Sequence, residues 1–184
     1  LAIVGRPNVG KSTLFNRLTG TRHALVDDQP GVTRDRRYGE GHIGPMDLTV
    51  IDTVGMEEHK DGAAMEARML AMTRAGIAEA DAALMVVDGI AGITPEDVYF
   101  ARWLRKQGKP VVLAVNKAEG KKAAPTMGEA WELGLGEPVP ISAEHGEGLA
   151  DLYEALAPLE EQFNRDDENA HEHELQLAII GRPN

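Results

Sequence analysis

Gly5-Arg6-Pro7-Asn8-Val9-Gly10-Lys11-Ser12 is the stretch that decides the fold. It fits the pattern G-x-x-x-x-G-K-[ST], in which backbone N–H groups surround phosphate oxygens, the lysine reaches the terminal phosphates and the hydroxyl ligates Mg²⁺. Residues 1–4 form an apolar run that suits a buried parallel strand, and residues 13–18 have helical spacing. The sequence therefore predicts a strand, a phosphate-binding loop and a helix that begins near Lys11 with its N–H groups turned toward the anion. The alternative is an ordinary glycine turn between a strand and a helix.

The composition indicates one globular domain with a full core. The chain has 184 residues, of which 42% are hydrophobic and 27% charged, and no segment approaches the apolar length that spans a membrane. The absence of cysteine excludes disulfides and thiolate metal sites and is compatible with a reducing compartment. A net charge of −11 argues against binding nucleic acid by bulk electrostatics. Because the chain starts without methionine, the sequence leaves open a targeting segment ahead of it.

The rest of the chain alternates predicted strands and helices. We expect a hairpin of strands over residues 38–43 and 48–51, and further strands over 82–87, 111–115 and 139–141. Helices are expected over 63–78, from the Thr94-Pro95 cap to Gly108, over 127–133 and over 148–156, whereas 21–37 reads as a long irregular connection. This alternation implies right-handed crossovers and a mostly parallel sheet with helices on both faces. The predicted fold is an α/β three-layer sandwich of the P-loop NTPase type, with one antiparallel strand.

Polar motifs follow the predicted strands at their carboxyl ends, where ligands bind in such a sheet. Asp52-Thr53-Val54-Gly55 comes directly after the second hairpin strand. Its aspartate can supply a carboxylate near a phosphate-bound metal, and its glycine N–H can meet a γ-phosphate. The pattern D-x-x-G occurs often by chance, but its place after this strand makes it a stronger signal.

A second pair of motifs predicts which base the site holds. Asn116-Lys117-Ala118-Glu119 follows the strand of residues 111–115, and Ser142-Ala143 follows the last predicted strand. A carboxylate in this place accepts two hydrogen bonds, from the ring N–H and the exocyclic amine of guanine, and adenine cannot supply them. The predicted ligand is therefore GTP or GDP.

With these motifs, the chain resembles the EngA/Der family of tandem-domain GTPases, in the Era-like branch of the translation-factor-related class. The resemblance lies in residues 30–35 (PGVTRD), 52–57 (DTVGME), 77–88 and the recurring LAI(V/I)GRPN, and it covers residues 1 to about 158. It implies a Mg²⁺-dependent enzyme that hydrolyses GTP slowly as a conformational switch. It also implies a role in assembly of the large ribosomal subunit in the bacterial cytoplasm, with no membrane partner.

The end of the chain repeats its beginning. Residues 177–184 (LAIIGRPN) match residues 1–8 (LAIVGRPN) at seven of eight positions, at an offset of 176 residues. Between them, residues 160–174 (EEQFNRDDENAHEHE) are polar, acidic and without apolar periodicity. We therefore expect a GTPase domain over residues 1–159, an acidic interdomain linker over 160–175 and the truncated start of a second GTPase domain over 176–184.

The resemblance implies roles for individual residues around the phosphates. Thr33 would join Ser12 around Mg²⁺ when the γ-phosphate is bound, with Asp52 acting on that metal through water. Gly55 would donate its N–H to the γ-phosphate, and Thr33 could alternatively only end a loop. The implied catalytic residues are Lys11, Thr33, Gly55 and Asn8. The implied phosphate-binding residues are Gly5, Arg6, Pro7, Asn8, Val9, Gly10, Lys11, Ser12, Thr13, Asp52, Thr53, Val54, Gly55 and Met56.

Asn8 is the position at which related potassium-stimulated GTPases place an asparagine that coordinates a monovalent cation. The resemblance thus implies K⁺ here, with Asp27 and Gln29 adding carbonyl oxygens; alternatively, Asn8 only stabilises its turn. Met56 stands where many small GTPases have a glutamine that orients water, so this side chain cannot hold the nucleophile. Catalysis would then rely on charge stabilisation, which a K⁺ ion bridging the phosphates could supply.

Glu119 replaces the aspartate that is usual in the base motif. Its side chain keeps the charge and the two acceptor oxygens but is one methylene longer, so we expect guanine preference to survive, with some loss of affinity unless the backbone retreats. The implied guanine-binding residues are Asn116, Lys117, Ala118, Glu119, Ser142 and Ala143.

Other functions remain open beside GTP hydrolysis. Met56 keeps open a non-catalytic domain that senses GTP or GDP and controls interdomain docking. A tRNA-modification GTPase is disfavoured, because that family has a single phosphate loop. The implied partners are the second GTPase domain in cis and the large ribosomal subunit with its rRNA, mainly through domains outside this chain. The basic cluster of Arg34, Arg36 and Arg37 could touch rRNA or could simply be solvated.

Overall fold

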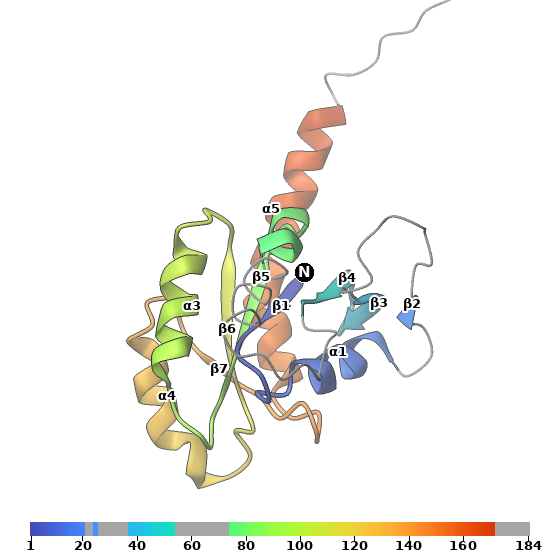
Figure 1. The fold of residues 1–184 in the computed structure, drawn as a ribbon. Coiled ribbons are helices and arrows are strands. Elements are labelled where there is room, and N and C mark those ends of the chain that lie inside the picture. Colours follow the sequence, from blue (N-terminus) through green and yellow to red (C-terminus); the bar gives the residue numbers. More distant parts are fainter. Residues whose placement is uncertain (21–23, 26–36, 54–73, 172–184) are drawn as a thin grey trace, which may run out of the picture.

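The fold is that of a computed structural model, which describes residues 1–20, 24–25, 37–53 and 74–171. Within these residues, seven strands form one sheet in the order β2-β3-β4-β1-β5-β6-β7 (Figure 1). Their bounds are β1 Ala2–Val4, β2 Ala24–Leu25, β3 Arg37–Ile43, β4 Met46–Asp52, β5 Ala83–Asp88, β6 Val111–Asn116 and β7 Val139–Pro140. β3 runs antiparallel to both β2 and β4, and the other neighbouring pairs are parallel. The predicted fold class, with one antiparallel strand, is confirmed.

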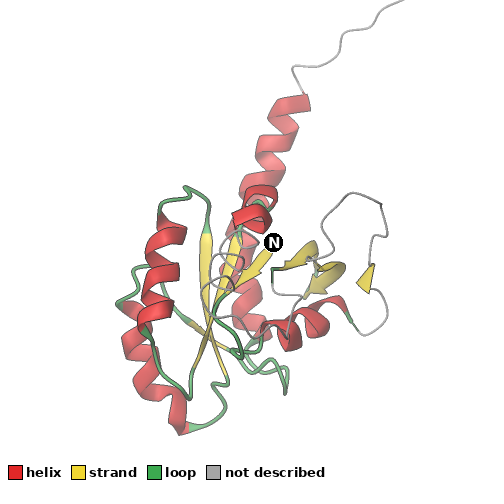
Figure 2. Ribbon diagram, in the orientation of Figure 1, coloured by secondary structure: helices red, strands yellow, loops and turns green. Residues whose placement is uncertain are grey.

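Helices cover both faces of this sheet (Figure 2). Their bounds are α1 Lys11–Thr19, α3 Pro95–Arg105, the 3₁₀ turn η1 Lys121–Ala123, α4 Ala124–Trp131 and α5 Leu149–His171. Residues 74–79 are helical as well. Within the described part of the chain, no helix is both long and apolar enough to cross a lipid bilayer.

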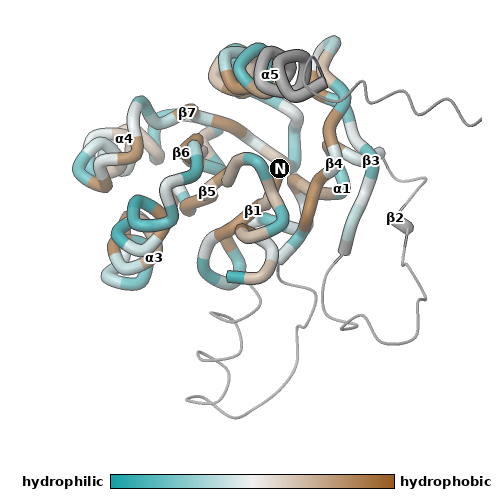
Figure 3. The backbone as a smooth tube through the Cα atoms, turned by 90° about the horizontal axis from the view of Figure 1, so that it is seen from above, coloured by the Kyte–Doolittle hydropathy of each residue, from teal (hydrophilic) through white to brown (hydrophobic). Residues whose placement is uncertain are grey.

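The buried hydrophobic residues of the described part of the chain form two cores, one on each face of the sheet. Phe15 of α1 and Leu152 of α5 belong to the first core, with alternate residues of the central strands. Phe100 of α3 and Ala130 of α4 belong to the second, with the remaining strand residues. β5 is buried along its whole length and hydrophobic up to Asp88 (Figure 3), because both of its faces are covered. This packing fixes the carboxyl ends of β1, β5 and β6 beside one another.

The β3–β4 hairpin has a tighter turn than the sequence analysis predicted. Ile43 pairs with Met46, so that Gly44 and Pro45 form the whole loop. Gly44 has φ +57°, and the two-residue hairpin turns favoured by the twist of β-strands need such a conformation. β4 therefore begins at Met46 and reaches Asp52, which places the carboxylate on the last residue of the strand.

The start of α3 follows the prediction. Thr94 caps the helix by accepting from the backbone N–H of Asp97, and the Asp97 side chain accepts from the backbone N–H of Thr94 in return. Pro95 occupies the first turn, where its missing N–H costs nothing. This reciprocal pair is a capping box, and it fixes the point at which the chain enters α3.

Three other predicted boundaries were wrong. The helix expected at 127–133 begins at Ala124, because Pro125 is accepted in its first turn. Part of the irregular connection, Ala24–Leu25, forms the edge strand β2 against β3. The helix expected over 148–156 extends as α5 to His171, since adding residues to an already packed helix costs far less than nucleating a new one. The interdomain role of residues 160–175 stays a prediction.

Candidate functional site

The phosphate loop joins β1 to α1 at the carboxyl edge of the sheet. Gly5 has φ +146°, and a Cβ atom there would collide with the carbonyl oxygen of Val86 in β5. Gly10, at the N-cap of α1, has φ +94°, and there is no room for a side chain here either, because a Cβ atom would collide with the Asn116 amide. No side chain of the described residues caps α1, so the backbone N–H groups of its first turn are available to an anion.

Lys11 is folded into this loop. Its side chain is buried, and its Nζ donates to the carbonyl oxygen of Arg6 at 2.6 Å. A buried ammonium group is stabilised by such carbonyl oxygens and by any anion that enters the loop. The loop can therefore present a positive charge to a phosphate group.

Ser12 and Asp52 bring two oxygen ligands together. The Ser12 hydroxyl donates to Oδ2 of Asp52 at 3.3 Å, and Asp52 is completely buried at the end of β4. Thr53, the next residue, donates from its hydroxyl to the Ile3 carbonyl oxygen at 2.8 Å and so fixes this strand end against β1. A hydroxyl and a carboxylate are ligand types that suit Mg²⁺, directly or through water. These two residues thus fit the metal that the phosphate-loop pattern implies.

Asn116 connects the phosphate loop to the loop after β7. Its Nδ2 donates to the Val9 carbonyl oxygen at 2.8 Å, and its Oδ1 accepts from the Ala143 N–H at 2.8 Å. Arg17 of α1 adds a further tie, because its Nε donates to the Ala143 carbonyl oxygen at 2.6 Å. The sequence motif around Ser142 is therefore held to the phosphate loop through Asn116 and to α1 through Arg17.

A cavity of about 380 Å³ opens between these loops. Its lining residues are Gly10, Thr13, Asn116, Lys117, Glu119, Ser142 and Glu144. Hydrogen bonds from its own backbone N–H and from the Ser142 hydroxyl, with the nearby His145 and Lys117, lower the pKa of Glu119 below its ordinary value despite some desolvation. Its Oε2 has no hydrogen-bond partner among the described residues. One carboxylate acceptor at this cavity thus lacks a donor.

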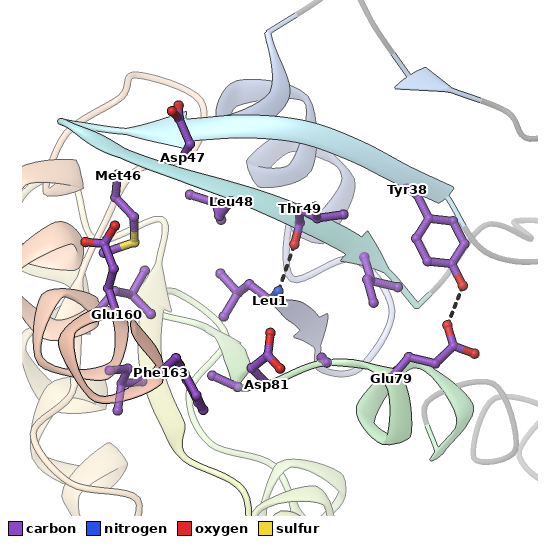
Figure 4. Close-up of a pocket in the computed structure, with 15 residues that line it drawn as sticks. Leu1, Tyr38, Met46, Asp47, Leu48, Thr49, Glu79, Asp81, Glu160 and Phe163 are labelled. Carbon is purple, nitrogen blue, oxygen red and sulfur yellow. Dashed lines mark hydrogen bonds between the residues drawn. The ribbon is translucent and has the colours of Figure 1, made fainter. Parts of the chain in front are cut away.

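A larger cavity, of about 480 Å³, lies on the side of the sheet away from the phosphate loop, near the start of β1 (Figure 4). The Leu1 ammonium group there donates to the Thr49 carbonyl oxygen at 2.7 Å. Four carboxylate residues line this cavity: Asp47, Glu79, Asp81 and Glu160. Negative charges repel phosphate groups, so the larger cavity does not suit a nucleotide.

The structure brings together most of the predicted site residues. The predicted site residues that lie outside the described residues are Asp27, Gln29, Thr33, Val54, Gly55 and Met56. Arg34, Arg36 and the repeated segment 177–184 also lie outside them. Asp88, Asp97 and Arg17 were missed by the sequence analysis, although all three touch the site or its loops. Asp88 alone offered a signal, because it follows the apolar run of β5 at the same sheet edge as the recognised motifs.

Residues 1–117 match the 50S ribosome-binding GTPase family. The GTPase Der of Azorhizobium caulinodans is 52% identical over 193 residues, and that of Rhodopseudomonas palustris strain TIE-1 is 53% identical over 194. Each alignment covers 100% of this chain and 42% of the relative, so the chain spans less than half the length of these proteins.

Solved structures have the same fold. A variant of Era from Aquifex aeolicus, bound to GDP and AlF4⁻, superposes with a TM-score of 0.66 at 33% identity. Era in complex with MgGDPNP and a segment of 16S ribosomal RNA gives 0.64 at 34% identity. Each superposition covers 84% of this chain and 54% of the other.

Relatives about half identical over the whole chain are GTPase Der proteins, and the resemblance to the EngA/Der family is confirmed. The matched segment, residues 1–117, contains the phosphate loop, Asp52 and the start of the base motif. The chain belongs to the 50S ribosome-binding GTPase family.

Proposed function

We propose that this chain binds GTP and hydrolyses it to GDP and phosphate, and that the two nucleotide states act as a conformational switch. The observation that carries the proposal is the Asn116 amide, which holds the Val9 carbonyl and the Ala143 N–H at 2.8 Å each. Through it, a phosphate loop and a base cavity are parts of one rigid unit. A nucleotide placed there would meet both ends of the site at once.

The described residues divide into two groups along such a nucleotide. Gly5 to Thr13 would surround the phosphates, with Lys11 supplying charge. Asn116 to Glu119, with Ser142 and Ala143, would form the base end. Glu119 would select guanine, because its carboxylate accepts from two N–H donors that adenine does not present. The unpartnered Oε2 of Glu119 supports this role.

Ser12 and Asp52 would hold Mg²⁺, and Thr33 would join them in the GTP state. When bound, the ion neutralises charge that develops on the β- and γ-phosphate oxygens. Asp52 orients the Ser12 hydroxyl, since it accepts a hydrogen bond from it at 3.3 Å and is itself buried and fixed at the end of β4. The MgGDPNP bound to Era supports Mg²⁺ as the metal of such a site.

We further propose that K⁺ stimulates turnover, with Asn8, Asp27 and Gln29 as its ligands. Met56 cannot hold the attacking water by a hydrogen bond, so another source of charge stabilisation is needed. The test compares GTP turnover in potassium and in sodium chloride at equal ionic strength. Faster turnover in potassium supports the proposal, and equal rates overturn it.

A nucleotide sensor without catalytic activity is the second candidate, and Met56 is the residue that favours it. Single-turnover hydrolysis by the chain, with GTP, Mg²⁺ and either cation, separates the two functions. Formation of GDP by the chain but not by its Lys11→Ala variant supports the enzyme. Tight binding of GTP without hydrolysis under either condition supports the sensor. Equal affinity for ATP and GTP would contradict guanine recognition in both cases.

For the whole protein we propose a role in assembly of the large ribosomal subunit in the cytoplasm, together with a second GTPase domain in cis. The family description, the relatives' greater length and the repeat at residues 177–184 support these partners. The net charge of −11 supports rRNA contacts that lie mainly outside this chain. Sedimentation of the full-length protein with purified 50S subunits, in GTP analogue and in GDP, tests the proposal. Failure to cosediment in both nucleotide states would refute it.

A further inference from the structure

Asp88 lies at the nucleotide site without belonging to any of its recognised motifs. It is the last residue of β5, and its side chain is only 8% exposed. Its Oδ1 accepts hydrogen bonds from the backbone N–H groups of Ile90 and Ala91, both at 2.9 Å. One carboxylate oxygen therefore holds the turn that leaves β5 and cannot rotate away without losing both bonds.

The other oxygen of Asp88 faces Lys117. The Lys117 Nζ donates to Oδ2 of Asp88 at 2.5 Å and to the Asn8 carbonyl oxygen at 3.1 Å. Burial alone would raise the pKa of Asp88, but the Lys117 hydrogen bond and charge and the two backbone N–H groups lower it below its ordinary value. The carboxylate is thus ionised at neutral pH. A continuous link runs from β5 through the Lys117 ammonium to the phosphate loop.

Lys117 and Asn8, whose carbonyl oxygen accepts from this ammonium group, both have unusual backbones. Asn8 has φ +64° and Lys117 has φ +61°, and they are the only non-glycine residues with positive φ in the described ranges. Such conformations are unfavourable for residues with a side chain and persist where their surroundings hold them. The Lys117 side chain is 38% exposed, so water competes for its ammonium group. A fixed anion is what keeps that group against the loop.

We infer that Asp88 is a positioning residue for the nucleotide site. Its carboxylate holds the Lys117 ammonium against the Asn8 carbonyl, and so forms the turn of the phosphate loop and one wall of the base cavity before the ligand arrives. Preformed sites bind more tightly because less conformational entropy is lost on binding. This inference rests on the proposed binding of guanine nucleotides.

The sign of the effect separates positioning from simple electrostatics. A carboxylate near a polyanionic ligand repels it, so its removal alone would tighten binding. Removal of a positioning group weakens binding instead, because Lys117 and the phosphate loop lose their fixed arrangement. Asp88→Asn is a suitable change, since its remaining oxygen can still accept from Ile90 and Ala91 while the anion is lost.

The experiment measures GDP affinity and dissociation rate for the parent chain, Asp88→Asn and a control, Asp47→Asn. Asp47 is exposed on β4 beside the distant cavity, so the control makes the same charge change away from the nucleotide. We expect Asp88→Asn to weaken GDP binding about tenfold through faster dissociation, the usual scale for one hydrogen bond to a charged group. The control should stay within about twofold of the parent. Unchanged or tighter binding by Asp88→Asn would overturn the inference.

A double-mutant cycle tests whether Asp88 acts through Lys117. In a Lys117→Met background, the Asp88→Asn change should cause no further loss of GDP affinity, because the group it positions is gone. An equal loss in both backgrounds would indicate that Asp88 only stabilises its turn, and would also overturn the inference. If Asp88→Asn fails to fold, Asp88→Ser takes its place, since a hydroxyl can accept from the turn without carrying charge. If the parent itself binds no GDP, the proposed function fails rather than the positioning role.

Discussion

Arg6 donates from its Nε to Oδ2 of Asp97 at 3.2 Å, and this pair ties the phosphate loop to the first turn of α3. Asp97 is completely buried, and the same Oδ2 accepts from the Thr94 backbone and hydroxyl in the capping box. Because the Arg6 carbonyl oxygen also accepts a hydrogen bond from Lys11, one residue links the helix cap to the lysine of the phosphate loop. The shape of the loop therefore depends on where α3 begins.

Loss of the Asp97 carboxylate should destabilise the fold. We expect Asp97→Ala to lower the free energy of unfolding by about 3 kcal/mol, because it leaves Arg6 as an uncompensated charge and removes half of the capping box. Urea denaturation at neutral pH measures the change. Glu96→Ala is the matched control, since Glu96 is an exposed acid in the same turn, and it should cost less than about 1 kcal/mol. Equal effects would show that only the charge near the helix start matters.

Gly10 should tolerate no side chain. Gly10→Ala would force a positive φ on alanine and push against the Asn116 amide, and we expect it to cost about 3 kcal/mol of stability and to abolish GDP binding. Gly108 also has a positive φ, of +71°, but open space around it. Gly108→Ala should therefore cost only about 1 kcal/mol and leave GDP affinity unchanged. Calorimetric titration with GDP and urea denaturation of both variants provide the comparison. GDP binding by Gly10→Ala at parental strength would refute the steric argument.

Glu119 should determine the base through its charge. Glu119→Gln replaces an acceptor oxygen by an N–H₂ donor, so two hydrogen bonds from guanine to a charged group are lost or weakened. We expect GDP affinity to fall about a hundredfold. Xanthosine diphosphate, with a carbonyl in place of the exocyclic amine, should bind the variant better than the parent. Equilibrium titration with both nucleotides tests this, and an unchanged ratio of affinities would exclude Glu119 from base recognition.

The same residue should give a defined pH dependence of stability. Hydrogen bonds from its own backbone N–H and from Ser142 lower the pKa of Glu119 in the folded chain. Its anion thus favours folding above the ordinary glutamate pKa of about 4.3, and this contribution is lost as the pH falls through the lowered value. The difference in unfolding free energy between the parent and Glu119→Gln should be constant from pH 8 to 5 and shrink at lower pH. A difference that persists at pH 2 would contradict this sign.

Local patterns in the sequence were sufficient for the sheet and for the loops at its edge. Apolar runs such as β5 and the Thr94-Pro95 cap act over a few neighbouring residues, so they can be read without knowing the partner elements. The extension of α5 was missed because its second half lacks an apolar face and depends on the packed first half. Asp88 and Asp97 were missed as site residues for a different reason, since their partners Lys117 and Arg6 are 29 and 91 residues away in the chain.

The length of α5 has a geometric consequence for whatever follows it. Beyond Phe163, which still lines the cavity near Leu1, the helix continues to His171 and points away from the sheet (Figure 1). At 1.5 Å per residue, residues 164–171 would carry the chain about 12 Å further in a fixed direction. A helix also fixes the azimuth of its end, so inserting one residue there would swing the following segment by about 100° around the helix axis. A flexible coil of the same composition would absorb such an insertion, because it does not fix the orientation of the following segment relative to the sheet.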